Sequence, residues 1–224
     1  MIELRAGTSD WAIWHNICDN NEYNLPDKIN GVVVDIGAHI GAFTYEACKR
    51  GASVVYAYEP DDINADLFIK NTGSCRNVHF SKVAIWGNYT GNILLCNYPY
   101  ENPREINTGG RSAVFIRSSE VAVVSCYSFL WVLDAVGGHI DLLKLDCEGA
   151  EMSILYQEIV CPANVKKIVG EYHNIGNDKN LAMHSRLLNL RSGSDIKATL
   201  ESRGYLVQID EHKDSIVGKF YADS

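Results

Sequence analysis

The sequence lacks the segments that would place it in a membrane or on a nucleic acid. Its longest apolar stretch, from Val121 to Leu133, is interrupted by two serines and is too short to span a bilayer. The first residues, MIELRAGTSDW, have neither the basic start nor the apolar core of a secretory signal. Basic residues are few, since 20 Lys and Arg stand against 28 Asp and Glu and give a formal net charge of −8. We therefore expect neither a membrane nor a nucleic acid as a partner.

The cysteines lack the spacing of a zinc site or a redox motif. Seven are present, and no two of them form a C-x-x-C pair. Scattered thiols in apolar segments are typical of a reduced intracellular protein, so we expect a cytoplasmic location. Repeats and linkers are also absent, and 224 residues suffice for one α/β domain with a proper core. We therefore expect a single domain over residues 1–224.

What the sequence does contain is organised around residues 32–41, VVVDIGAHIG. The run of valines is typical of a parallel strand that is buried on both faces. Gly37 and Gly41 permit a tight turn and the close approach of a ligand, and a helical pattern over 42–50 directs its N-terminal amides there. The spacing is D-x-G-x-x-x-G and not the dinucleotide-binding G-x-G-x-x-G. Asp35 beside the turn favours S-adenosylmethionine, whose amine is cationic, over a pyrophosphate.

Three later strands also end in acidic residues. The strand over 53–58 ends in Glu59-Pro60, where a carboxylate can accept hydrogen bonds from both hydroxyls of a ribose. The strand over 140–145 ends in Asp146, and the strand over 167–170 ends in Glu171-Tyr172-His173. If the strands over 32–36 and 140–145 are neighbours, Asp35 and Asp146 face each other across the crevice where ligands bind in open α/β sheets.

The remaining segments support these strands. A helix over 10–18 lies in an N-terminal segment, 1–30, which either covers the pocket or only packs against the domain. Residues 88–127 are predicted to form an insertion of short strands (93–96, 113–116 and 121–126), with a mobile loop over 98–111. A strand is also expected over 78–86, helices over 61–71, 128–136, 150–158, 181–190 and 195–203, and final strands over 205–209 and 216–221.

These motifs carry a resemblance to a known family. VVVDIGAHIGAFT, YAYEP, KLDCEGAE and IVGEYH are similar to the corresponding segments of the FkbM-type S-adenosylmethionine-dependent methyltransferases. The chain departs from the family at two places, because members often have Asn at the position of His39 and Val at that of Cys147. The resemblance implies a Rossmann-like, doubly wound α/β sheet of about seven strands, mostly parallel with the last strand antiparallel, plus a small β decoration.

The resemblance also implies where the cofactor lies. The backbone of Gly37, Ala38 and Gly41 would contact the methionine part, and Asp35 would shape this end of the site. Glu59-Pro60 would hold the ribose, Val83 and Ala84 the adenine, and His39 would face solvent or the cofactor's carboxylate. Asp146 would approach the methionine part or the point of methyl transfer.

Known members mostly methylate hydroxyl oxygens, so we predict an O-methyltransferase that acts on a small molecule, sugar or natural product. The candidate catalytic residues are Asp146, Glu171 and His173, with His173 the best suited to act as a base at neutral pH. A structural role for His173 remains an alternative, as does a helix-capping role for Glu148.

Three alternatives remain open from the sequence. Asp146, Glu148, Glu171 and His173 have the side chains of a magnesium site, but spacing does not show that they converge, so no metal ligand is assigned. The other two alternatives are an NAD-dependent oxidoreductase and a non-catalytic cofactor-binding module. The oligomeric state cannot be predicted.

Overall fold

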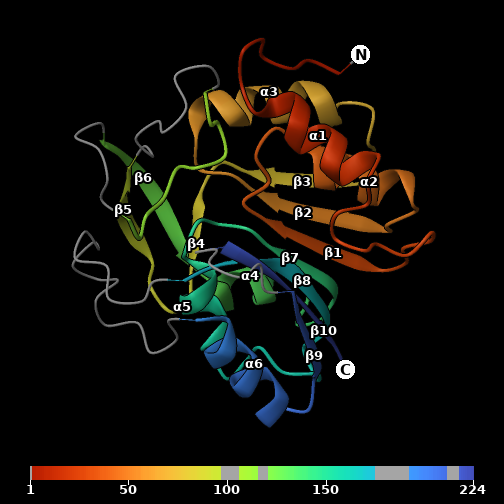
Figure 1. Ribbon diagram of the computed structural model, residues 1–224, viewed down its shortest axis with the longest axis vertical. Helices are drawn as coiled ribbons and strands as arrows, with labels where there is room; N and C mark the ends of the chain where they lie inside the picture. Colours follow the sequence, from red (N-terminus) through yellow and green to blue (C-terminus); the bar gives the residue numbers. More distant parts are fainter. Residues whose placement is uncertain (1, 97–105, 116–120, 175–191, 211–216) are drawn as a thin grey trace.

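A twisted sheet of seven strands runs through the molecule (Figure 1). From edge to edge its strands are β3 (Val78–Ser81), β2 (Val54–Tyr58), β1 (Val32–Ile36), β7 (Ile140–Leu145), β8 (Val165–His173), β10 (Val217–Asp223) and β9 (Leu206–Asp210). The computed structural model describes residues 2–96, 106–115, 121–174, 192–210 and 217–224. β10 is antiparallel to β8 and to β9, whereas the pairs from β3 to β8 are all parallel. This confirms the predicted Rossmann-like sheet with an antiparallel last strand.

Helices cover both faces of the sheet because successive strand residues point to opposite sides. Val33 and Leu142 pack with α1 (Asp10–Cys18) and α2 (Ala42–Lys49), and Val34 and Leu143 belong to the larger core on the other face. The other helices are α3 (Asp62–Thr72), α4 (Phe129–Ala135), α5 (Glu151–Leu155) and α6 (Gly193–Ser202). No described helix is long and apolar enough to cross a bilayer.

The predicted β decoration is a second sheet, and its strands differ in part from the prediction. It contains β4 (Ala84–Trp86), β6 (Val121–Ser128) and β5 (Gly91–Cys96), in that order. The single strand predicted over 78–86 was wrong, because a tight turn, in which the Val83 amide donates to the Ser81 carbonyl, separates β3 from β4. The strand predicted over 113–116 was also wrong over its described part. The Ser112 hydroxyl accepts hydrogen bonds from the amides of Val114 and Phe115, which holds the chain in a bend at Ala113 and Val114.

Two further elements differ from the prediction. α5 ends at Leu155 and not at residue 158. The Arg203 guanidinium donates hydrogen bonds to the backbone carbonyls at and after this end, those of Leu155, Tyr156, Gln157 and Val160, in place of the amides of a continuing helix. β8 extends to His173, so Glu171 and His173 are strand residues paired with β10. The helix predicted over 181–190 and residues 98–105 of the predicted loop lie outside the described residues.

Candidate functional site

A cavity of about 500 Å³ lies at the carboxyl ends of β1, β2, β7 and β8. The chain order reverses between β1 and β7, which pair directly, so this is the switch point at which α/β sheets bind ligands. Of the residues predicted for the site, the cavity is lined by Gly37, Ala38, His39, Glu59, Pro60, Val83, Ala84, Asp146 and Glu171. Asp35, Gly41 and His173 do not line it. Residues of the N-terminal segment, including Ser9, Ile13 and Tyr23, close one side.

The turn after β1 requires glycine. Gly37 has a φ of +78°, and a Cβ on it would lie 1.8 Å from the backbone oxygen of Asp146. Without a side chain, the turn approaches the end of β7 closely, and the amides of Gly37 and Ala38 both donate to the Tyr58 carbonyl. Gly41 has a different role, because a Cβ there would collide with the side chains of Phe68 and Thr72 on α3. Gly37 thus shapes the cavity, whereas Gly41 allows helix packing.

Glu59 lies at the end of β2 with its carboxylate held by backbone amides. Oε2 accepts from the amide of His39 and Oε1 from that of Asp61, each at 2.9 Å. Burial raises the pKa of Glu59 to about 7, and these two hydrogen bonds only partly oppose it. Each carboxylate oxygen has a second lone pair, so Glu59 can still accept hydrogen bonds from a ligand in the cavity.

Asp35 binds a lysine that sequence reasoning missed. The Lys144 ammonium lies 3.2 Å from Asp35 Oδ1 and donates to the Gly37 carbonyl at 2.5 Å, while the Thr44 hydroxyl donates to Asp35 Oδ2. Both charged side chains are buried, and Lys144 also lies 3.9 Å from Asp146. Asp35 and Asp146 were expected to face each other directly, but the Lys144 ammonium lies between them. Asp35 does not line the cavity, whereas Lys144 does. A single lysine within the strand sequence IDLLKL is the one sequence signal that could have revealed it.

A chain of hydrogen bonds fixes the protonation of His39. The Thr108 hydroxyl donates to Asp10 at 2.7 Å, so it accepts from the Nε2 of His39 at 3.0 Å. Arg5 holds Asp10 through two hydrogen bonds of 2.8 Å. Burial lowers the pKa of His39 to about 4, so the ring is neutral with its proton on Nε2. Nδ1 is buried and has no hydrogen-bond partner in the described part of the chain. The expectation that His39 faces solvent was wrong.

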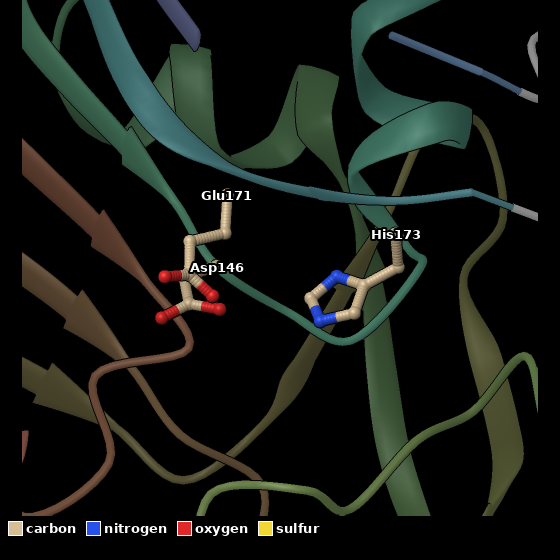
Figure 2. A group of neighbouring side chains, drawn as sticks. All are labelled: Asp146, Glu171 and His173. Atoms are coloured by element: carbon tan, nitrogen blue, oxygen red, sulfur yellow. The ribbon is translucent and has the colours of Figure 1, made fainter. Parts of the chain in front are cut away.

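Asp146 and Glu171 project toward each other at the ends of β7 and β8 (Figure 2). The Tyr23 hydroxyl donates to Asp146 at 2.8 Å. Burial, and then the charge of Asp146, raise the pKa of Glu171 to about 8. His173 lies beside the pair, and one ligand atom of each of the three side chains falls within 4.8 Å of the others.

His173 is held between two further carboxylates. Its Nδ1 lies 2.7 Å from Glu151 and its Nε2 3.2 Å from Glu148. Burial alone lowers the pKa of an imidazole, but Glu148 and Glu151 outweigh burial and raise the pKa of His173 well above its ordinary value. The expectation that His173 is a base tuned to neutral pH was therefore wrong, because in this arrangement the ring holds its proton.

Comparison with known families assigns the chain. The model of the methyltransferase FkbM domain matches residues 35–207. The protein belongs to the FkbM methyltransferase family. It is thus an S-adenosylmethionine-dependent methyltransferase with S-adenosylmethionine as its cofactor, as the sequence motifs predicted, and the family does not support the NAD-dependent alternative.

Solved structures resemble this FkbM methyltransferase at low sequence identity. They include a precorrin-6y C5,15-methyltransferase from Geobacter metallireducens, which is 13% identical over 99% of this chain and 93% of that chain, with a TM-score of 0.47. A SAM-dependent methyltransferase from Aquifex aeolicus is 12% identical over 93% and 90%, with a TM-score of 0.47. TrmK of M. capricolum, solved with S-adenosylhomocysteine, is 11% identical over 91% and 66%, with the same TM-score. No curated protein matches the sequence.

Proposed function

We propose that this FkbM methyltransferase transfers the methyl group of S-adenosylmethionine to a hydroxyl oxygen of a small molecule. Methylation of a hydroxyl requires an oxygen placed in line with the sulfonium methyl and a means of removing the hydroxyl proton. The observation that carries the proposal is the carboxylate pair Asp146 and Glu171, which lines the cavity next to the glycine turn. These two carboxylates face the acceptor and favour loss of its proton.

The cofactor is proposed to lie along the turn after β1. Its methionine part contacts the backbone of Gly37 and Ala38, and its ribose hydroxyls donate to Glu59. The adenine lies against Val83 and Ala84. These positions leave the ends of β7 and β8 for the acceptor.

His39 adds a constraint on the cofactor's orientation. Its Nε2 proton is donated to Thr108, and its Nδ1 is an unprotonated acceptor with almost no accessible surface, so the ring offers no hydrogen-bond donor to the cofactor's carboxylate. This replaces the sequence-based expectation that His39 meets the carboxylate. The cavity volume of about 500 Å³ lies within the range of ordinary ligand pockets, which supports a small-molecule acceptor beside the cofactor.

Acceptors in matched pairs test the reaction type. The protein is incubated with S-adenosylmethionine and a set of sugars, phenols and aliphatic alcohols, each paired with the amine of the same skeleton, and S-adenosylhomocysteine release is measured. We expect release with members of the alcohol series. Release confined to the amine series would contradict O-methylation.

The variant Glu59→Ala tests the position of the ribose. Loss of the carboxylate removes the charge-assisted hydrogen bonds to the ribose, and we expect S-adenosylhomocysteine to bind about tenfold or more weakly, at about 1.5–3 kcal/mol per such bond. Isothermal titration calorimetry measures the affinity, with Glu201→Ala on the exposed side of α6 as the control. Equal affinity of the two variants would show that the ribose lies elsewhere.

A further inference from the structure

The side chains of Asp146, Glu171 and His173 converge from two adjacent strand ends (Figure 2). Parallel pairing of β7 with β8 places Asp146 just beyond Leu145, whose register partner is Gly170, one residue before Glu171. His173 follows two residues later on the same strand and so points to the same side of β8 as Glu171. Register therefore brings together two carboxylates and an imidazole, a convergence that sequence spacing could not show.

We propose that Asp146, Glu171 and His173 bind a divalent cation of the class represented by Mn²⁺ and Mg²⁺. Carboxylate oxygens are ligands of both ions, and an imidazole nitrogen favours the transition-metal member. One ligand atom from each residue lies within 4.8 Å of the others, so one ion can contact all three after small side-chain rotations. The site adjoins the cavity because Asp146 and Glu171 line it.

Glu151 holds the imidazole as a metal ligand requires. It is fully buried and accepts from the amides of Gly149 and His173 as well as lying 2.7 Å from His173 Nδ1. A ligating histidine commonly donates its second ring N–H to such a carboxylate, which fixes the ring and leaves Nε2 for the metal. Metal binding at Nε2 releases the proton that this nitrogen shares with Glu148 when no cation is bound.

The carboxylates of Asp146 and Glu171 have few close partners among the described residues. Asp146 has the Tyr23 hydroxyl at 2.8 Å and Lys144 at 3.9 Å, and Lys144 is already paired with Asp35. The Glu171 carboxylate has no hydrogen bond or ion pair in the described part of the chain. Two adjacent carboxylates in a partly buried position repel each other unless a proton or a cation lies between them.

The role of the cation rests on the proposed O-methylation. The acceptor hydroxyl binds the cation and loses its proton to Glu148, which lines the cavity and is 20% exposed, so that the proton can pass to solvent. The resulting oxygen anion attacks the methyl carbon. The new C–O bond forms as the S–CH₃ bond breaks, and the electron pair of the S–CH₃ bond stays on sulfur to give S-adenosylhomocysteine. The cation stabilises the oxygen anion as a Lewis acid and positions it.

Titration with MnCl₂ tests the site without measuring activity. Electron paramagnetic resonance follows the loss of free Mn²⁺ signal in the presence of the full chain, and calorimetry measures S-adenosylhomocysteine binding on the same sample. We expect saturable binding of one Mn²⁺ per chain, competed by Mg²⁺. Normal S-adenosylhomocysteine binding with no saturable Mn²⁺ binding would overturn the metal site and leave the methyltransferase proposal standing.

Variants locate the ion. Glu171→Gln and His173→Gln keep similar volumes, and we expect each to weaken Mn²⁺ at least about tenfold, since loss of an outer partner alone costs 10–100-fold. The control is Glu22→Gln, a carboxylate that lines the same cavity but is paired with Lys219 at 2.7 Å. It should bind Mn²⁺ as the wild type does. Circular dichroism confirms folding of each variant, and unchanged Mn²⁺ affinity in a folded Glu171→Gln variant would overturn the assignment.

Discussion

Replacing Lys144 by Met leaves a negative charge without its cation in the centre of the sheet. Asp35 is fully buried, Lys144 is 3% exposed, and their charged atoms lie 3.2 Å apart. The Thr44 hydroxyl, which donates to the other carboxylate oxygen of Asp35, is neutral, so it does not replace the positive charge of Lys144. The substitution also removes the hydrogen bond from Lys144 to the Gly37 carbonyl.

The expected cost follows from these contacts. At an effective dielectric constant of about 20, unit charges 3.2 Å apart attract by about 5 kcal/mol, and removal of one partner of a buried pair typically costs 3–5 kcal/mol. We therefore expect Lys144→Met to lower the free energy of unfolding by about 3–5 kcal/mol. Asp35→Asn together with Lys144→Met removes both charges, so the double variant should be more stable than Lys144→Met alone.

Urea unfolding followed by circular dichroism measures these differences through the midpoint and slope of each transition. Lys219→Met is the matched control, because Lys219 lies on β10 of the same sheet but is 23% exposed in its pair with Glu22, and such a pair contributes about 1 kcal/mol or less. A cost for Lys144→Met no larger than that of Lys219→Met would show that Asp35 does not need the Lys144 charge. So would a double variant that is less stable than Lys144→Met.

Three other predictions concern the cavity. The folded pKa of Glu59 is about 7 against an ordinary value of 4.5. Without cofactor, the protonated form of Glu59 therefore stabilises the protein by up to about 3 kcal/mol; this stabilisation is complete below pH 4.5 and is lost as the pH rises through 7. Glu59→Gln should flatten this loss in thermal melts between pH 5 and 8. Thr108→Val removes the acceptor of the His39 Nε2 proton and a donor to Asp10, and calorimetry should show severalfold weaker S-adenosylhomocysteine binding. Gly37→Ala should lower the melting temperature sharply, because the added Cβ would lie 1.8 Å from a backbone oxygen after β7.

The sequence was most informative where one local signal determines the structure. The run VVVDIG followed by glycine turns marked β1 and the cavity, and strand ends at Glu59, Asp146 and Glu171 placed those three side chains around it. Parallel strands end at one edge, so chain order and strand ends suffice to predict that such residues are near one another.

The features that the sequence did not predict depend on contacts between residues far apart in the chain. Thr108 contacts His39 across 69 positions and Tyr23 contacts Asp146 across 123, and no local pattern reports either contact. The division of 78–86 into β3 and β4 depends on a turn inside an apolar run that reads as one strand. The protonation of His173 depends on Glu148 and Glu151, whose distance from the ring is set by the path of the chain after β7.

The atom that receives the methyl group distinguishes O-methylation from methylation of nitrogen or carbon. The protein is supplied with S-adenosylmethionine carrying a ¹³C-labelled methyl group and with an acceptor that supports S-adenosylhomocysteine release, and the product is examined by nuclear magnetic resonance. We expect a methyl resonance typical of a methoxy group, with its coupling to the acceptor carbon passing through oxygen. A labelled methyl bonded to nitrogen or carbon would contradict it.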